Sequence, residues 1–163
     1  MNQAAVDHFL NALQPAFHAG DPDVAAKAAE AENVHRLQEQ YRALARGDYP
    51  AVLGHFADDV ELEVVGPPDV PFVGRWQGLD QVRDALQKNF AMVEDQRPEL
   101  QALTAQGDTV VVVARERGRL RATGREYDLH WVQLFTYRDG KVVRMREIFD
   151  SAAMRKALQP GGG

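Results

Sequence analysis

The sequence predicts an α+β protein in which helices come first and a curved antiparallel sheet packs around them, forming a cone with a small-molecule pocket inside. Two observations predict this fold. Apolar residues recur at every third or fourth position up to Phe56, and at every second position after Asp59. Short turn signals separate the later alternating segments, and such short links join antiparallel neighbours. A chain of 163 residues has room for one core of this kind.

Three helices are predicted before the first strand. The first covers about residues 3–18, and the second covers 24–46, where helix-forming residues predominate and Gly47 ends the pattern. The third is short and continues through Phe56, with Asp48 as its N-cap. Their apolar stripes consist of Val6, Phe9, Leu10, Leu13 and Phe17, then of Val34, Leu37, Tyr41 and Leu44, then of Val52, Leu53 and Phe56.

Strands dominate the rest of the chain. The first is predicted at 60–64, where apolar and acidic residues alternate. Residues 66–71 predict a loop because they are rich in glycine and proline, and a helix is expected from Gly78 to Val93. Four further strands are predicted at 98–106, 109–119, 126–137 and 141–149. The turn signals between them are Gly107-Asp108, Ala122-Thr123-Gly124 and Asp139-Gly140. A short helix is expected over 151–158.

The composition narrows the possible functions. A formal net charge of −5 argues against a nucleic-acid partner, which would require a concentrated basic field. The chain has no cysteine, its five histidines lack the paired spacing of metal ligands, and its glycines form no phosphate-binding motif. There is no long apolar run and no signal peptide. We therefore expect a cytoplasmic protein with no metal or other cofactor and with neither membrane nor nucleic acid as a partner.

Four stretches of the chain, taken in order, carry a resemblance to a known family. They are YRALARGD at 41–48, HFADDV at 55–60, GRWQG at 74–78, and YRDGKV at 137–142 leading to REIFD at 146–150. Over about residues 34–158 they resemble the SnoaL-like, ketosteroid-isomerase-related branch of the nuclear transport factor 2-like superfamily. The resemblance implies a cystatin-like roll. It leaves residues 1–33 as an N-terminal helical extension and 159–163 as a disordered tail.

The resemblance implies a range of activities, because the family includes polyketide cyclases, steroid isomerases, limonene-type epoxide hydrolases, dehydratases and members that only bind or dimerise. A homodimer formed through the sheet is accordingly expected. The position of the steroid-isomerase base is occupied here by Val64, which cannot take a proton. Their buried acidic donor matches Gln133, and their tyrosine donor lies near Tyr41. Steroid isomerisation itself is therefore disfavoured.

Limonene-type epoxide hydrolases offer a second comparison, since they use two carboxylates and an arginine. Their final-strand carboxylate matches Glu147, and their arginine matches Arg115. Their other carboxylate falls at Arg117. The resemblance therefore implies that one of the two carboxylates is missing from this chain.

Glu147 is the main candidate for chemistry. Its face of the last strand also holds Val143, Met145 and Phe149, while the other face holds Val142, Arg144, Arg146 and Ile148. The resemblance places the Glu147 face inward. Burial in an apolar cavity would raise the pKa of this carboxyl and suit a general acid or base. The alternatives are an ion pair with Arg115 or Arg146, or a position that faces solvent.

Other residues are expected to line the pocket. On the strand at 126–137, Trp131 and Gln133 share one face. If this face points into the pocket, both residues line it and His130 faces away. His55 could reach the pocket mouth. The four arginines of 115–121 either hold an anionic substrate or form a solvated face paired with Glu116 neighbours and Glu126. The candidates for substrate binding are Trp131, Phe56, Trp76, Arg115, Met145, Phe149 and Val64.

The leading hypothesis is a SnoaL-like enzyme that uses acid/base chemistry without a cofactor on an apolar polyketide-, terpenoid- or steroid-like substrate. It would be of the cyclase, isomerase, hydratase or hydrolase type, with Glu147 transferring the proton and Gln133 and Tyr41 orienting an oxygen. The alternative is a non-catalytic ligand-binding or dimerisation module of the same fold. A third hypothesis assigns residues 1–33 to partner or dimer contacts, because their apolar stripe must be buried somewhere.

Overall fold

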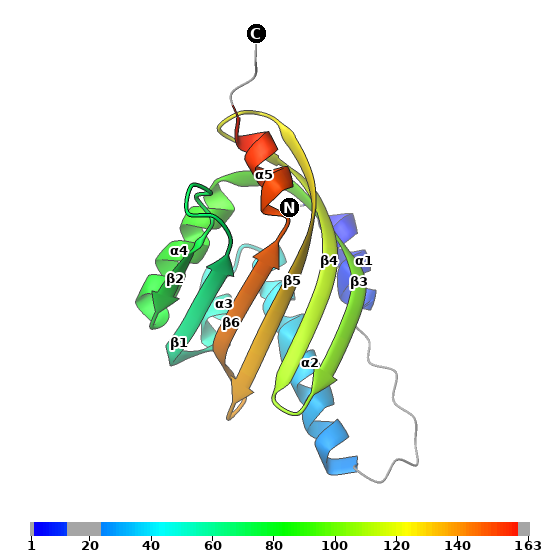
Figure 1. Cartoon of the computed structure of the whole chain (residues 1–163). Helices are drawn as coiled ribbons and strands as arrows, with labels where there is room; N and C mark the ends of the chain where they lie inside the picture. The colour runs from blue at the N-terminus through cyan, green and yellow to red at the C-terminus, as the bar shows by residue number, and fades with distance from the viewer. Residues whose placement is uncertain (1, 13–23, 160–163) are drawn as a thin grey trace.

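The computed structural model describes residues 2–12 and 24–159, and this part of the chain folds into five helices and six strands (Figure 1). In chain order the elements are α1 (Gln3–Ala12), α2 (Val24–Ala45), α3 (Tyr49–Gly54), β1 (Phe56–Val65), β2 (Gly74–Gln77), α4 (Leu79–Ala91), β3 (Val93–Gln106), β4 (Thr109–Leu120), β5 (Glu126–Arg138), β6 (Lys141–Phe149) and α5 (Ser151–Leu158).

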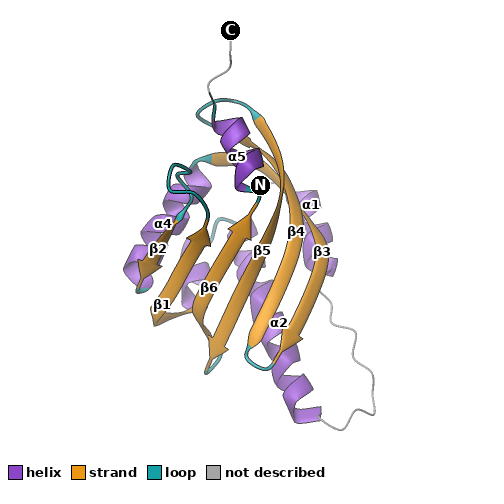
Figure 2. Ribbon diagram, viewed as in Figure 1, coloured by secondary structure: helices purple, strands orange, loops and turns teal. Residues whose placement is uncertain are grey.

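The strands form one curved sheet in the order β2-β1-β6-β5-β4-β3. Adjacent strands are antiparallel except for β1 and β6, which run parallel. The sheet stays open, the helices α1 to α4 lie on its concave side, and α5 packs beside β5 (Figure 2). The arrangement confirms the predicted α+β fold with a curved, mainly antiparallel sheet around N-terminal helices.

The core fills the space between the concave face of the sheet and the helices. Every second residue of a strand points to that face, so a strand contributes its alternating apolar residues to the core. The most deeply buried side chains are Leu37 on α2, Val60 and Leu62 on β1, Val110 and Val112 on β4, Phe135 on β5 and Val142 on β6. No helix in the described residues is long and apolar enough to cross a membrane.

Helix α1 belongs to this same core. Its side chains Val6, Phe9 and Leu10 are buried, and the ring of Phe9 meets the ring of Tyr41 edge-on at 5.2 Å. The described part of the N-terminal apolar stripe is therefore buried against the chain itself, and its burial requires no partner. Leu13 and Phe17, together with the predicted end of this helix at residue 18, lie outside the described residues.

The predicted helix boundaries hold at most positions. Asp48 caps α3 as expected, because its Oδ1 accepts a hydrogen bond from the backbone N–H of Ala51 at 3.1 Å. Phe56, expected to end this helix, instead begins β1, where it pairs with Val142 of β6. Helix α2 runs without interruption past the expected limit of the N-terminal extension at residue 33.

Three features of the sheet differ from the prediction. Residues 74–77 form an edge strand, β2, which no alternating pattern indicated and which pairs with β1. Strand β3 begins at Val93 and not near 98. The register of β3 against β4 shifts between Glu94 and Arg97, and this irregularity lets the segment before residue 98 stay paired with β4. A register shift between β5 and β6 also turns Val142 inward, where it is fully buried, instead of onto the outer face.

Candidate functional site

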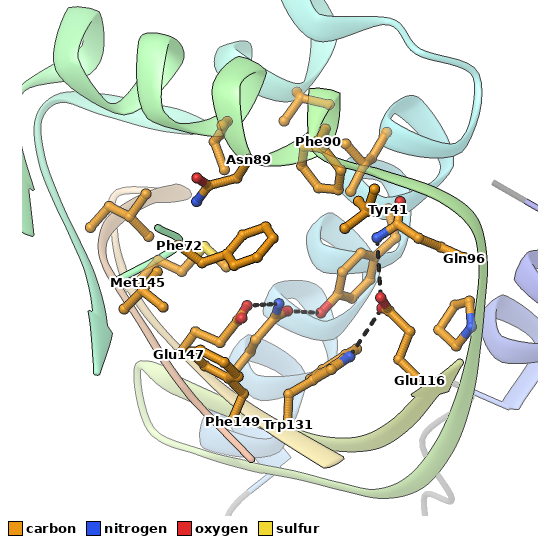
Figure 3. Close-up of a pocket in the computed structure, with 18 of the residues that line it drawn as sticks. Tyr41, Phe72, Asn89, Phe90, Gln96, Glu116, Trp131, Met145, Glu147 and Phe149 are labelled. Carbon is orange, nitrogen blue, oxygen red and sulfur yellow. Dashed lines mark hydrogen bonds between the residues drawn. The ribbon is translucent and has the colours of Figure 1, made fainter. Parts of the chain in front are cut away.

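A cavity of about 170 Å³ lies between the helices and the concave face of the sheet (Figure 3). Most of its wall is apolar, and aromatic rings contribute from helices, strands and the loop before β2. These rings belong to Phe9, Tyr41, Phe56, Phe72, Phe90, Tyr127, Trp131, Phe135 and Phe149. Such a largely apolar cavity with a few polar groups is typical of a small-molecule site.

A hydrogen-bonded chain of three side chains crosses one wall of the cavity. The hydroxyl of Tyr41 on α2 donates to Oε1 of Gln133 on β5 at 2.5 Å, and Nε2 of Gln133 donates to Oε2 of Glu147 on β6 at 2.6 Å (Figure 3). Gln133 and Glu147 can meet because they are directly paired across the antiparallel strands β5 and β6. Tyr41 therefore determines which end of the Gln133 amide faces Glu147.

The environment of Glu147 favours its protonated form. Burial raises the pKa of Glu147 from its ordinary 4.5 to about 7, the hydrogen bond from Gln133 opposes this shift, and the negative charge of Glu116 adds to it. Burial also raises the pKa of Tyr41 well above its ordinary value, so its hydroxyl keeps the proton that it donates. Glu147 can consequently be protonated or ionised near neutral pH.

Glu116 is a second carboxylate in the cavity wall, and the sequence interpretation overlooked it. Its Oε1 accepts hydrogen bonds from Tyr127 at 2.7 Å and Gln96 at 3.2 Å, and its Oε2 accepts one from Trp131 at 3.2 Å. The residue continues the alternation of fully buried residues Val110, Val112 and Ala114 along β4. The sequence alone provides no such signal, because Val111 and Val113 supply apolar residues to the other face of the strand as well.

The structure brings most of the predicted site residues together. The expected catalytic residues Glu147, Gln133 and Tyr41 all line the cavity. So do five of the residues expected to bind substrate, namely Trp131, Phe56, Met145, Phe149 and Val64. Their placement is an observation, while their roles stay predictions. Neither expected competitor pairs with Glu147, because Arg115 binds Asp128 and Arg146 binds Glu63.

Arg115, expected to bind substrate, does not line the cavity. Arg115 lies on the outer face of the sheet and donates two hydrogen bonds to Asp128, at 2.7 and 2.6 Å. Arg117 shares that face, 3.7 Å from Glu99. The cause is the pleat, because Glu116 points inward and its two neighbours must point outward. A carboxylate therefore lies in the cavity wall one residue before Arg117, in Glu116.

The prediction for Trp76 is also not met. Trp76 pairs with Leu62 at the β2 edge of the sheet, where it is partly buried against the core and is not among the residues that line the cavity. Its ring lies so close to Gly74 that a side chain there would come within 2.9 Å of it. His130 faces away from the cavity as expected, 3.3 Å from Gln101, and His55 does not line it either.

Three further cavity residues were not singled out from the sequence. Phe72 comes from the loop before β2, Asn89 from the last turns of α4 and Gln40 from α2. A polar residue on the apolar side of a helix was the only local signal for Asn89 and Gln40. No cluster of three or more potential metal ligands occurs in the part of the chain that the structure describes.

The curved sheet, the helices on its concave side and the enclosed cavity place this chain among the nuclear transport factor 2-like proteins. Residues 37–145 match the SnoaL-like domain. The chain therefore belongs to the SnoaL-like domain family. No curated protein sequence matches it.

Several solved structures share the fold. A nuclear transport factor 2-like protein of Burkholderia xenovorans LB400 is 32% identical, over 78% of this chain and 96% of that one, with a TM-score of 0.69. TerC, which was co-crystallized with polyporic acid, is 26% identical over 77% and 97%, with a TM-score of 0.68. An epoxide hydrolase of M. tuberculosis is 20% identical over 78% and 89%, with a TM-score of 0.61 and a likeness in fold alone.

Proposed function

We propose that this protein is a cofactor-independent acid/base enzyme that acts on an apolar small molecule held in the cavity. The observation that carries the proposal is Glu147, a carboxyl group in an aromatic wall whose pKa is about 7. A group with a pKa near the working pH can take a proton and return it in the same catalytic cycle. The wider family supports the proposal, since epoxide hydrolases occur among the structures with this fold.

The two oxygens of Glu147 have different surroundings. Oε2 accepts the hydrogen bond from Gln133, whereas Oε1 has no hydrogen-bond partner among the described residues. Oε1 is therefore the atom that would receive a proton from substrate. Gln133 holds the carboxylate in place, and Tyr41 acts through Gln133, so both are positioning residues in this proposal.

Val64 occupies the position of the steroid-isomerase base and cannot take a proton. The position of Glu147 explains how the cavity could still support acid/base chemistry. Val64 and Glu147 are direct partners across the parallel strands β1 and β6, and both line the cavity. The carboxyl group thus lies one strand away from the place where steroid isomerases carry their base. In the reaction we propose, a carbon next to a carbonyl gives its proton to Oε1, and the same proton returns to another atom of the substrate.

Deuterium exchange tests the proposal without knowledge of the natural substrate. Cyclohexanone is an apolar single-ring ketone, and its carbon-bound hydrogens next to the carbonyl exchange with solvent when a base removes them. In heavy water, the wild-type protein should accelerate this exchange well beyond buffer, and Glu147→Gln should reduce the acceleration by about 100-fold or more, as expected on removal of a general base. Mass spectrometry of the ketone measures the exchange.

The matched control is Glu126→Gln, which removes an exposed carboxylate from β5 and should leave the exchange rate unchanged. Equal acceleration by wild type and Glu147→Gln would show that Glu147 is not the base.

The second candidate function is a non-catalytic ligand-binding module, favoured by Val64 at the position of the steroid-isomerase base. Binding of the ketone without any acceleration by the wild-type protein would support that candidate and contradict the enzyme.

A further inference from the structure

Two buried acceptor atoms in the cavity wall have no hydrogen-bond partner. They are Oδ1 of Asn89 and Oε1 of Gln40, and both residues line the cavity. Gln40 as a whole is 5% exposed. A buried acceptor without a donor costs about 1–3 kcal/mol, so native proteins seldom keep one without a reason. Both atoms would be satisfied by a donor that enters the cavity.

Asn89 lies across the cavity from the proposed base. It extends from α4 on the helical side, while Glu147 extends from β6 on the sheet side, and both line the cavity together with Phe72 (Figure 3). A molecule in the cavity would therefore meet Glu147 at one end and Asn89 at the other. Its middle would rest against aromatic rings.

The charge of the cavity wall selects against anions. Among the described residues that line it, none is lysine, arginine or histidine, whereas Glu116 and Glu147 are both present. An anionic ligand would lose its hydration without gaining a counter-ion, and burial of an unpaired charge is strongly unfavourable. Phosphate and carboxylate ligands are disfavoured on this ground.

The volume limits the ligand further. The cavity of about 170 Å³ is close to the ~150 Å³ of an engineered apolar cavity that holds benzene. A single ring with short substituents fills such a space. Larger fused systems would require the cavity wall to move.

We propose that the cavity binds an uncharged molecule built on one ring, with a hydroxyl group that donates to Oδ1 of Asn89 while the opposite end faces Glu147. The inference deepens the proposed function, on which it rests for the role of the Glu147 end. Asn89 is then a specificity-determining residue, because it distinguishes a hydroxylated ring from a ring without a donor at that end. A buried polar group discriminates well against a ligand that leaves it unpaired.

A ligand-and-variant cycle tests the assignment. The probes are hydroquinone and resorcinol, each with two hydroxyl groups, phenol with one, and benzoate as the anion. Dissociation constants are measured from the fluorescence of Trp131, which lines the cavity, in a Trp76→Phe background that removes the only other tryptophan. Calorimetry on the protein with both tryptophans checks that the background substitution does not alter binding.

In the background protein, at least one diol should bind about fivefold more tightly than phenol, beyond the statistical advantage of its second hydroxyl. Benzoate should bind at least about tenfold more weakly than phenol. Asn89→Leu, which keeps the size of the side chain, should abolish the diol preference, and it should weaken phenol by about twofold at most, because phenol can still turn its single hydroxyl toward Glu147. Gln87→Leu on the exposed side of α4 is the control and should keep the preference.

A diol preference that survives in Asn89→Leu, or that is absent from the background protein, would overturn the proposal and indicate that water satisfies Asn89. Tight binding of benzoate would overturn it as well. If Asn89→Leu no longer binds phenol, Asn89→Ala repeats the comparison with a smaller change. Failure of the proposed function has a different signature, since the diol preference would persist while deuterium exchange would not depend on Glu147.

Discussion

Two glutamates line one cavity, and their neighbours give them different properties. Glu116 accepts three hydrogen bonds, which compensate its charge within the wall. Glu147 accepts one, from Gln133, and lies between Met145 and Phe149 on the inner face of β6. Burial outweighs this single hydrogen bond and raises the pKa of Glu147, which is therefore the residue suited to proton transfer.

The raised pKa of Glu147 predicts a pH-dependent free energy of unfolding. Between pH 4.5 and about 7 the folded protein holds a proton on Glu147 that the unfolded chain has released, so stability falls as pH rises through this range. Each pKa unit corresponds to about 1.4 kcal/mol, which gives a loss of about 3 kcal/mol for the whole range. Glu147→Gln should lack this loss.

Urea denaturation of wild type and Glu147→Gln, from about pH 4 to about pH 8, measures the effect. All other titrating groups are common to both proteins, so the difference between the two curves isolates Glu147. The difference should change in favour of Glu147→Gln as pH rises. A difference that stays constant with pH would show that the pKa of Glu147 is not raised in the folded protein.

Among the elements, β5 holds Glu116 of β4 in place through Tyr127, whose ring lies over Gly118 of β4. Gly118 pairs with Tyr127, and a Cβ atom at Gly118 would lie 2.5 Å from the Tyr127 hydroxyl and 2.6 Å from the ring carbon that bears it. The tyrosine can therefore donate to Glu116 only because position 118 has no side chain. The glycine is a packing requirement of the site.

Gly118→Ala should displace Tyr127 from Glu116 and lower the free energy of unfolding by about 1–3 kcal/mol, as overpacking does. Thermal unfolding followed by circular dichroism measures the change. Gly54→Ala is the control, since nothing lies within 4 Å of a Cβ at that position, and it should cost little. An unchanged melting temperature for Gly118→Ala would contradict the proposed packing of the tyrosine.

At the scale of the whole molecule, the outer face of the sheet leaves apolar side chains in solvent. Val65 and Ile148 are 39% and 46% exposed, and they are direct partners across β1 and β6. Val132 lies beside Ile148 on β5, and arginine–glutamate pairs such as Arg146 with Glu63 flank the patch. We propose that a second copy of the chain covers this face, because an apolar centre with a polar rim is typical of an interface.

Light scattering tests the homodimer. The wild-type protein should have the mass of a dimer, and Ile148→Lys should shift it toward the monomer without loss of folding, since the side chain is exposed in the single chain. Gln87→Lys on the exposed side of α4 introduces the same charge and should leave the mass unchanged. A monomeric wild type, or a dimer that tolerates Ile148→Lys, would contradict the proposed interface.

Features that depend on near neighbours could be predicted from the sequence. The apolar stripes of α2 and α4, the cap at Asp48 and the turns at 107–108 and 139–140 are local, and the elements follow them closely. The inward position of Glu147 came from its resemblance to a known family together with the alternation on β6. Alternation on β5 put Gln133 on the same face as Trp131 without choosing the face, and both residues line the cavity.

The buried face of β4 depends on contacts between distant segments, and the sequence could not predict it. Four consecutive valines at 110–113 supply an apolar residue to both faces, so alternation alone is consistent with either Arg115 or Glu116 inside. Packing of the helices on the concave face selects Glu116. The pairing of β2 with β1 and the meeting of Asn89 and Glu147 across the cavity likewise join segments far apart in the chain, and no local pattern specifies such contacts because the curvature of the sheet creates them.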